Sequence, residues 1–366
     1  MTTVHLVYPH SERISCPDAI GRHLGERLAN YYRVKLYDWF EFRRLEPSPG
    51  DVLVGHACPL PMTVFSRSCR DPRWSRVLLL SPHCHGDNYQ PAFNDRALPH
   101  CDLYLAITGR FWFDSVRDSR FAHWLPKMRH VDLAVDRREY PAIKDQFEKP
   151  GSRKFLYIGS DAWYKNVEYL SAIGERLPSG PVSWIGSDTP RRGLRALGRH
   201  DFSSPAGRAV ISNHDFLLTV GKADGNPSSI LEAMAWGLVP VCTPQSGYQG
   251  YPGILNIPLD DLGRAIQLLN EIQGFDEGRL KQMQRLNWAA LDNHFNWDRF
   301  ARQVLEAIEV PSSPPLLSCR PSNRLAIRWA EITNPFIREC FNPRKLLRRL
   351  AKVTSSRRPS RVATEC

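Results

Sequence analysis

The stretch ADGNPSSILEAMAWG, residues 223–237, places two carboxylates on either side of a turn and a helix start. Asp224 precedes the turn, and Glu232 follows eight positions later. The amides of residues 226–229 and the positive end of the helix dipole form a suitable seat for a diphosphate. Glu232, about one turn inside, can reach two neighbouring hydroxyls such as those of a ribose. The stretch therefore predicts a sugar-nucleotide site; the alternative is a capped helix with two solvated acids.

Local signals define this helix. Pro227 is favourable in a first helical turn, and Ser228 or Ser229 can cap the exposed amides. Gly237 can end the helix in the left-handed conformation. Asp224 would face whatever is attached beyond the phosphates. The donor-binding residues expected from the stretch are Gly225, Asn226, Pro227, Ser228, Ser229 and Glu232.

The elements that position these residues alternate along the chain. Short runs that are apolar on both faces, as in parallel strands covered by helices, are separated by amphipathic segments. In the first half, strands are expected at 4–8, 33–39, 51–57, 76–83 and 101–108, with a helix at 17–32. In the second half, strands are expected at 154–160, 181–187, 214–220 and 237–243, with a helix at 165–177. This alternation predicts an α/β fold with two doubly wound, Rossmann-like domains.

A charged, turn-rich segment at residues 129–153 suits an interdomain linker. We expect an N-terminal domain at 1–140, a linker at 141–153 and a second domain at 154–295. The segment 276–310 is expected to be helical, with residues 296–310 returning to the first domain. Ligands of open α/β sheets bind beyond the carboxyl ends of the strands. If two such domains face each other, we expect a cleft between them. It would lie near the residues that follow the expected strands: His10, His56, His83, His85, Gly159, Gly186 and Asp224.

Composition narrows the class of protein. The 366 residues are 42% hydrophobic and 24% charged, as in ordinary globular proteins. No secretory signal or long apolar run is visible, and nine scattered cysteines suggest free thiols in a reducing cytoplasm. Residues 311–366 hold twelve Lys and Arg against three Glu, so this tail carries +9 of the net charge of +11. Because the remaining chain is nearly neutral, nucleic acid is not an expected partner.

The stretch ADGNPSSILEAMAWGLVPV resembles the signature of glycosyltransferase family 4, within the GT-B superfamily. That signature has two glutamates separated by seven residues, and they fall on Asp224 and Glu232. KFLYIGSDAWYKN resembles the family's strand, glycine turn and lysine, and VDLAVDRREY resembles its linker. The family's two histidine-ended strands are similar to DVLVGHACP and RVLLLSPH. Its turn before a helix is similar to ITGR. The resemblance covers most of the chain.

The resemblance implies a retaining glycosyltransferase with a UDP- or GDP-sugar donor, a saccharide or lipid-linked acceptor, and neither a metal nor another cofactor. Lys165 would neutralise the leaving diphosphate, beside the turn at Gly159 and Ser160. Glu232 would bind the ribose, and Asp224 the transferred sugar near its 3-hydroxyl. Taken alone, Lys165 also fits an exposed lysine at a helix start.

Two departures from the family stand out. Ser160 occupies the place of the usual arginine and brings no charge, so Lys154, Arg191 and Arg192 are the candidate substitutes. The loop at residues 8–21 holds no glycine before Gly21, although the family's loop is often glycine-rich.

The histidines are assigned to the acceptor side. His83 matches the family's histidine near the 6-hydroxyl of the sugar and is the third expected catalytic residue, after Asp224 and Lys165. His85 fits almost as well, and His10 and His56 are further acceptor-side candidates. His83 and His85 flank Cys84 and so raise the question of zinc, but zinc needs about four ligands and no second paired cluster is visible. Plain loop histidines are the alternative.

The tail mixes apolar and basic residues at 336–352, as in segments that lie on anionic membranes. This predicts a cytoplasmic protein, peripheral at the inner face of the cytoplasmic membrane; the alternative is a disordered tail. Ser160 and Asp224 also motivate a second function, a non-catalytic GT-B binding subunit. A nucleotide-sugar epimerase-like enzyme is third.

Overall fold

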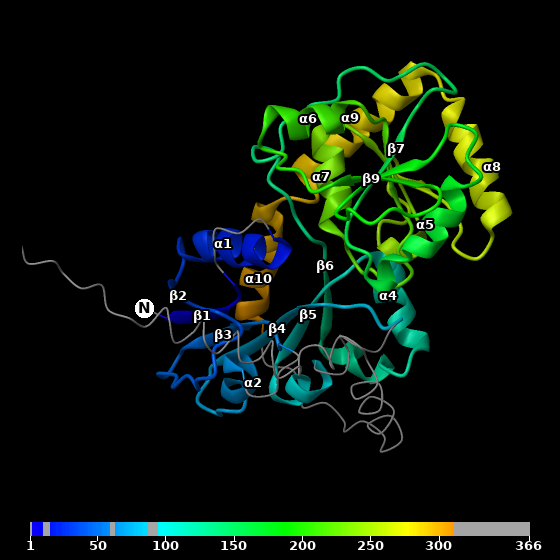
Figure 1. Ribbon diagram of the computed structural model, residues 1–366. Coiled ribbons are helices and arrows are strands. Elements are labelled where there is room, and N and C mark those ends of the chain that lie inside the picture. The colour runs from blue at the N-terminus through cyan, green and yellow to red at the C-terminus, as the bar shows by residue number, and fades with distance from the viewer. Residues whose placement is uncertain (1, 10–14, 59–62, 87–93, 311–366) are drawn as a thin grey trace, which may run out of the picture.

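The computed structural model describes residues 2–9, 15–58, 63–86 and 94–310. They form two lobes, one above the other in Figure 1, and each lobe is built on a six-stranded parallel sheet. This confirms the predicted α/β class with two Rossmann-like domains. His10 and the tail at 311–366, including the expected membrane segment at 336–352, lie outside the described residues.

The N-terminal sheet has the strand order β2-β1-β3-β4-β5-β6. Its strands are β1 (Thr3–Val7), β2 (Arg33–Tyr37), β3 (Val52–Gly55), β4 (Arg76–Pro82), β5 (Leu103–Ile107) and β6 (Met128–Val131). Helix α1 (Cys16–Leu28) lies on one face, and α2 (Val64–Ser68) is on the other side of the sheet (Figure 1). Helix α4 (Arg110–Ser115) follows β5 and approaches the upper lobe.

The C-terminal sheet has the order β12-β11-β10-β7-β8-β9. Its strands are β7 (Phe155–Ile158), β8 (Val182–Ile185), β9 (Leu194–Gly198), β10 (Phe216–Thr219), β11 (Val239–Cys242) and β12 (Leu255–Asn256). The helices that accompany them are α5 (Val167–Gly174), α6 (Pro205–Ser212), α7 (Ser228–Trp236), α8 (Leu262–Gln273) and α9 (Glu277–Asn293).

Three strands were missed in the sequence. Strand β6 overlaps the start of the charged segment 129–153, for which no strand was expected, and β9 and β12 were not anticipated. All three contain polar or half-exposed positions: β6 is MRHV, with Arg129 exposed, and β9 is LRALG, with Arg195 exposed. Each is an edge strand, so it does not need the continuous apolar run of a strand buried on both sides.

The segment 276–310 is two helices rather than one. Helix α9 ends at Asn293, and the side chain of Asn296 accepts a hydrogen bond from the Arg299 amide at the start of α10 (Trp297–Glu309). Helix α10 packs beside α1 in the lower lobe (Figure 1). Arg27 Nε lies 2.6 Å from Asp298 Oδ1, so α10 ties the end of the second domain to the first.

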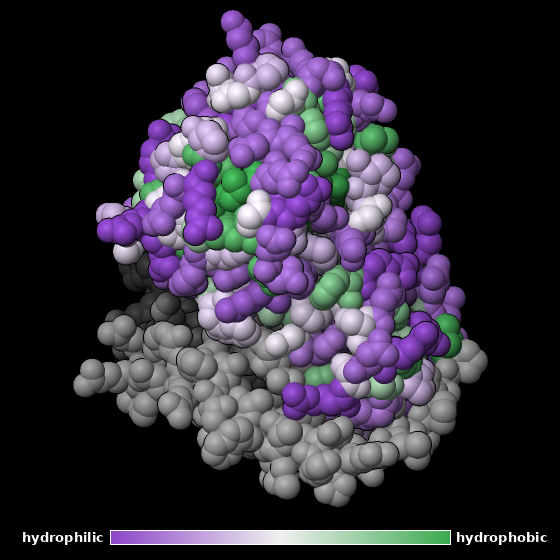
Figure 2. All heavy atoms as spheres, turned by 90° about the vertical axis from the view of Figure 1, so that its right-hand side faces the viewer, coloured by the Kyte–Doolittle hydropathy of each residue, from purple (hydrophilic) through white to green (hydrophobic). Residues whose placement is uncertain are grey.

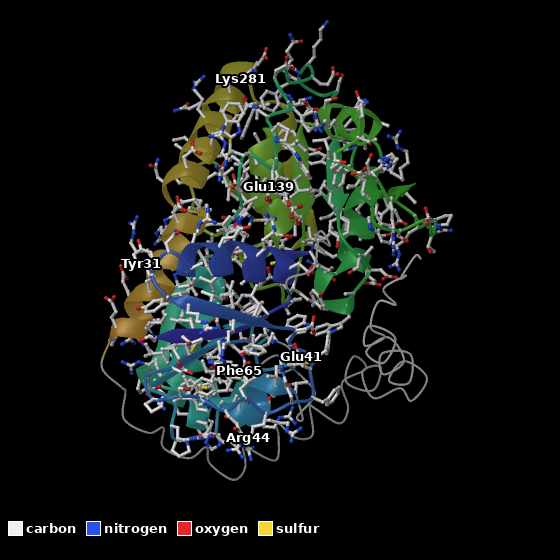
Figure 3. All side chains as sticks on the ribbon, turned by 90° about the vertical axis from the view of Figure 1, so that its left-hand side faces the viewer. Tyr31, Glu41, Arg44, Phe65, Glu139 and Lys281 are labelled. Carbon is white, nitrogen blue, oxygen red and sulfur yellow. The ribbon has the colours of Figure 1, made fainter. Side chains whose placement is uncertain are left out.

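The hydrophobic interior runs through both lobes. One cluster of buried residues joins Leu6 and Ile107 of the lower sheet to Leu231 and Trp236 of the upper domain. In Figure 3, Phe65 lies within the lower lobe, whereas Glu139 lies at the level where the two lobes meet. The face shown in Figure 2 is dominated by hydrophilic residues, with hydrophobic residues in small groups. Among the described helices, none has the length and apolar character needed to cross a bilayer.

Candidate functional site

Helix α7 begins where the upper lobe faces the lower one, at the carboxyl end of the sheet. Pro227 is its N-cap residue, and no side chain caps the first amides. The expected serine cap is therefore wrong, because the helix starts at Ser228 and Pro227, whose side chain cannot accept a hydrogen bond, occupies the N-cap position. The amides of the first turn consequently remain available to an anion. Gly237 ends the helix with φ 97°, as predicted.

The turn before α7 is stabilised by a buried tyrosine. The Tyr248 hydroxyl donates to Asn226 Oδ1 and lies 3.3 Å from the carbonyl oxygen of Pro227. Tyr248 is fully buried, so it fixes the turn rigidly. The amides of Ser228 and Ser229 are thus presented by a well-supported loop.

Lys165 and Asp224 form an ion pair beside this helix start. Lys165 ends the short helix η4 (Trp163–Lys165) after β7, and its Nζ lies 2.5 Å from Asp224 Oδ2. Burial, the largest single effect, lowers the pKa of the Lys165 ammonium, but the charge and hydrogen bond of Asp224 together with Tyr164 and Cys16 more than offset it, so the pKa is raised. The pair brings together two predicted catalytic residues that are 59 positions apart.

Glu232 lies one turn into α7 and lines an interdomain cavity. Burial raises the pKa of its carboxyl, while the Ser228 hydrogen bond and the Lys165 charge act in the opposite direction. Cys16, the first residue of α1, faces this group from the other domain. Burial first, and then the charge of Glu232, raises the pKa of its thiol to about 12. The neutral thiol and the start of α1 therefore cover the site from the lower lobe.

The cavity has a volume of about 730 Å³ and draws its walls from both domains. Helix α1 contributes Cys16 and Arg22, and helix α7 contributes Ser228, Glu232 and Trp236. Further walls come from the segment after β6 and from the loop after β9, at residues 133–136, 139–140 and 200–203, and from Arg208 and Trp297. The cavity is large enough for a nucleotide-sized ligand.

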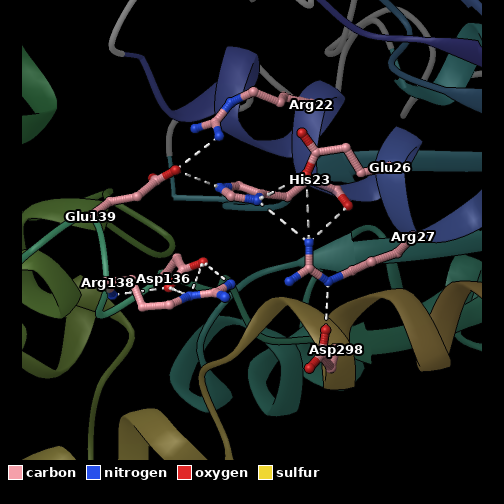
Figure 4. A network of polar contacts seen from close by, with 8 residues as sticks. All are labelled: Arg22, His23, Glu26, Arg27, Asp136, Arg138, Glu139 and Asp298. Carbon is pink, nitrogen blue, oxygen red and sulfur yellow. Dashed lines mark hydrogen bonds and ion pairs between the residues drawn. The ribbon is translucent and has the colours of Figure 1, made fainter.

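An ionic network holds the segment after β6 against α1 (Figure 4). The Glu139 carboxylate lies 2.8 Å from Arg22 Nη1 and 3.4 Å from His23 Nε2. On the same segment, Arg138 binds the carboxylate of Asp136, with a shortest distance of 2.7 Å. These contacts fix the wall of the cavity that connects the two domains.

A second contact between the domains combines a close approach of backbone with side-chain packing around Trp112. The Gly109 amide donates to the Gly225 carbonyl at 2.7 Å, and the Trp112 indole donates to the Gln245 carbonyl at 2.8 Å. A Cβ atom on Gly109 would lie 1.8 Å from the carbonyl oxygen of Gly247, so no larger residue fits there. We call Gly109, Gly225 and Gly247 the glycine junction.

His56, His83 and His85 do not line the cavity. The carbonyl of His83 is close to Gly225, but its ring packs against Tyr104 and Trp124 in the lower core. His83 Nε2 lies 3.2 Å from His85 Nδ1, and burial lowers the pKa of His83 to about 3. His56 packs against Tyr8 and Trp39, with a pKa that burial also lowers to about 3. Both rings are therefore neutral.

The glycine turn after β7 is compact. The Gly159 carbonyl accepts from the Trp184 indole at 2.8 Å, and a Cβ on Gly186 would lie 2.3 Å from that carbonyl. Ser160 is exposed, and its carbonyl accepts from the Tyr157 hydroxyl at 2.8 Å. The turn thus offers backbone and a hydroxyl group but no charge.

The proposed substitutes for the missing arginine do not reach the cavity. Lys154 precedes the first residue of β7, whereas Ser160 follows the other end of this strand. Arg191 pairs with Glu168 at 2.8 Å, and neither Arg191 nor Arg192 lines the cavity. Arg22 and Arg208 do line it, although sequence reasoning singled out neither. Among the described residues, no three His, Cys, Asp or Glu side chains are grouped as a metal would require.

Comparisons with known proteins identify the fold. No family model and no curated protein matches the sequence. A sucrose-phosphate synthase from Thermosynechococcus elongatus has a TM-score of 0.63 at 13% identity, with 84% of this chain and 98% of that chain covered. The lipopolysaccharide outer core galactosyltransferase WaaB has a TM-score of 0.60 at 15% identity, with 84% and 99% covered.

A third neighbour is an α-glucosyltransferase solved in complex with UDP and a 13-mer DNA, with a TM-score of 0.55 at 10% identity and 84% and 99% covered. All three chains are covered almost completely. At these identities the likeness establishes the fold alone. The chain has the two-domain GT-B fold of glycosyltransferases, as predicted.

Proposed function

We propose that the chain is a retaining glycosyltransferase that uses a nucleoside diphosphate sugar and needs no metal. One observation carries this proposal: Ser228 at the uncapped start of α7 and Glu232 line a cavity between two GT-B domains, and Lys165 lies close enough for its charge to act on Glu232. The ammonium and the amides can neutralise the diphosphate, and Glu232 can accept hydrogen bonds from a ribose. The UDP complex of a fold neighbour supports a nucleotide in such a cleft.

The proposed catalytic contribution is electrostatic. When the bond between the sugar and the diphosphate breaks, negative charge accumulates on the leaving phosphate oxygens. Lys165 and the α7 amides are already positioned at that end of the helix, so they need little reorganisation. Asp224 lies next to Lys165 and is placed to hold a hydroxyl of the transferred sugar. The acceptor, a saccharide or a lipid-linked glycan, would enter from the lower domain.

The decisive experiment incubates the full-length protein with a panel of nucleoside diphosphate sugars and measures nucleotide release, with and without EDTA. Release that persists in EDTA and is lost in Glu232→Gln supports the proposal, and NMR of the product tests retention at the anomeric carbon. Asp145→Asn, at an exposed residue outside the cavity, is the matched control. Absence of release with every donor, together with no thermal shift from UDP or GDP, would contradict it.

The non-catalytic alternative rests on Ser160, which brings no charge to the turn after β7, and on Asp224, which stands where the family has a glutamate. Tight binding of a nucleoside diphosphate without any turnover, in the presence of varied glycan acceptors, would favour this reading. An epimerase-like activity would instead convert the donor sugar without releasing nucleotide, and the same assay detects it.

A further inference from the structure

The residues of α7 that line the cavity indicate how a bound nucleotide would be oriented along the helix. Ser228, Glu232 and Trp236 are spaced four residues apart, so they share one face of the helix. At about 1.5 Å per residue they span roughly 12 Å. If the diphosphate lies at the uncapped start and the ribose at Glu232, the base must reach Trp236. This order rests on the proposed function.

The end of the cavity near Trp236 has an aromatic wall. The Phe202 ring lies 4.9 Å from the buried Trp236 ring, and both residues line the cavity. Around them the loop after β9 places His200, Asp201 and Ser203. An aromatic wall with polar groups at its rim suits a nucleobase.

Asp201 is oriented by its own loop. Its Oδ1 accepts from the Ser203 amide at 2.9 Å and from the Ser203 hydroxyl at 2.7 Å. Its Oδ2 has no hydrogen bond to any of the described residues. The carboxylate therefore presents an unused acceptor at the rim, and its geometry is set by bonds that remain when a ligand enters.

Two neighbours complete the set of polar groups. His200 Nε2 lies 2.8 Å from the Leu197 carbonyl and must donate to it, so Nδ1 of the neutral ring is an acceptor. Arg208 Nε lies 3.4 Å from the Phe202 carbonyl, and its terminal nitrogens are not bonded to the described part of the chain. The rim thus offers two acceptors and a cationic donor.

This set discriminates between bases. Guanine presents two adjacent donors, N1–H and N2–H₂, beside the O6 acceptor, which match a carboxylate and a guanidinium. Uracil presents a single N–H between two carbonyl oxygens, which a carboxylate repels. We propose that the loop after β9, through Asp201, selects a guanine nucleotide as the donor, with Arg208 facing O6.

The test is calorimetric titration of the full-length protein with GDP, UDP, ADP and CDP. We expect GDP to bind at least about tenfold more tightly than the other three, because a hydrogen bond to a charged group is worth at least that factor. Asp201→Asn keeps the Oδ1 bonds to Ser203 and should weaken GDP binding about 10- to 100-fold while leaving UDP binding unchanged or stronger. Asp145→Asn is the control and should bind GDP as the wild type does.

The outcomes separate the two proposals. If UDP, ADP or CDP binds as tightly as GDP, or if Asp201→Asn binds GDP normally, the assignment of guanine is wrong while the proposed function stands. If no nucleoside diphosphate binds to the wild type, both fall together. Thermal unfolding of each variant without ligand establishes that a loss of binding is not a loss of folding.

Discussion

Lys165 Nζ lies 2.5 Å from Asp224 Oδ2, beside the uncapped first turn of α7. The two side chains are largely buried, with exposed fractions of 17% and 13%. Without a donor, the ammonium that would meet the diphosphate is thus already neutralised by a carboxylate. A diphosphate must compete with Asp224 for Lys165 or share it. The two partners should therefore respond in opposite ways to substitution.

Lys165→Ala should weaken nucleoside diphosphate binding about 10- to 100-fold, because a charge-assisted hydrogen bond is lost. It should also lower the free energy of unfolding, since Asp224 remains as a largely buried carboxylate without its cation. Calorimetry and urea unfolding measure the two effects. The double variant Lys165→Ala, Asp224→Asn should recover part of the stability but not the binding. Unchanged nucleoside diphosphate binding in Lys165→Ala would show that the ammonium does not contact the diphosphate.

Asp224→Asn should separate binding from turnover. The released Lys165 can then interact with the diphosphate alone, so nucleoside diphosphate binding should stay equal or tighten up to about tenfold. Sugar transfer should fall at least about 100-fold if Asp224 orients the transferred sugar. Titration and steady-state kinetics test both statements. Weakened binding with normal turnover would mean that Asp224 serves only to hold the loop.

Glu232 is expected to recognise the ribose, and a double-mutant cycle isolates that contact. A 2′-deoxynucleoside diphosphate should bind the wild type about tenfold more weakly than the ribonucleotide, because a hydrogen bond to a carboxylate is lost. In Glu232→Gln this difference should shrink to about threefold or less, since a neutral acceptor bonds less strongly. If the two effects simply add, Glu232 does not touch the 2′-hydroxyl.

Local sequence patterns were sufficient to locate individual strands and helices that have a strong signal of their own. Strand β4 and strand β5 are buried runs and were located within a few residues, because parallel central strands must be apolar on both faces. Edge strands escape this rule, so MRHV of β6 passed for linker. Helix α7 was located from its proline and glycine, but the capping role of its serines was wrong, since Pro227 occupies the N-cap position.

Long-range geometry was out of reach of local patterns. The resemblance singled out Lys165, Asp224 and Glu232, yet nothing in their spacing shows that Lys165 pairs with Asp224. Arg22 and Asp201 line the cavity because a helix and a loop from different domains meet there, which only the packed structure reveals. His83 was singled out by strand position, but its fully buried ring, just after β4, packs against Tyr104, which the local pattern does not show.

Buried histidines should make the protein sensitive to acid. The pKa of His83 is about 3 in the folded state, below the usual value of about 6.5. Between these values the unfolded chain binds a proton that the folded chain does not, so stability falls as the pH drops below 6.5. His83→Asn should reduce the slope of unfolding free energy against pH by up to about 1.4 kcal/mol per unit between pH 6 and 4.5. His123→Asn is the control, at a half-buried residue. An unchanged slope would mean that His83 is protonated in the fold.

The basic segment at 336–352 is expected to bind anionic membranes through charge. Replacing Arg344, Lys345, Arg348 and Arg349 by Gln should lower binding to phosphatidylserine vesicles at least about 100-fold, since each charge near the surface contributes roughly 1 kcal/mol. Vesicle sedimentation at low and high salt measures this. Replacing Arg357, Arg358 and Arg361 is the matched control and should matter less if the apolar residues of 336–352 contribute. Equal binding to neutral vesicles would exclude the electrostatic explanation.

The glycine junction should control how closely the domains approach. The Gly109 amide donates to the Gly225 carbonyl, and a Cβ on Gly109 would lie 1.8 Å from the Gly247 carbonyl oxygen. Backbone on both sides cannot yield as a flexible side chain would, so Gly109→Ala must push the junction apart. The two sheets share no strand, so we expect each lobe of the variant to keep its secondary structure.

We therefore expect Gly109→Ala to increase the radius of gyration in solution scattering and to lower sugar transfer at least about tenfold, because displacement by about 1 Å at a reacting centre is costly. Circular dichroism should remain unchanged. Gly263→Ala, on α8 with only Asp261 Oδ1 near the added carbon at 3.5 Å, is the matched control and should leave scattering and transfer as they are. Normal scattering and transfer in Gly109→Ala would show that the distance between the domains does not depend on this junction.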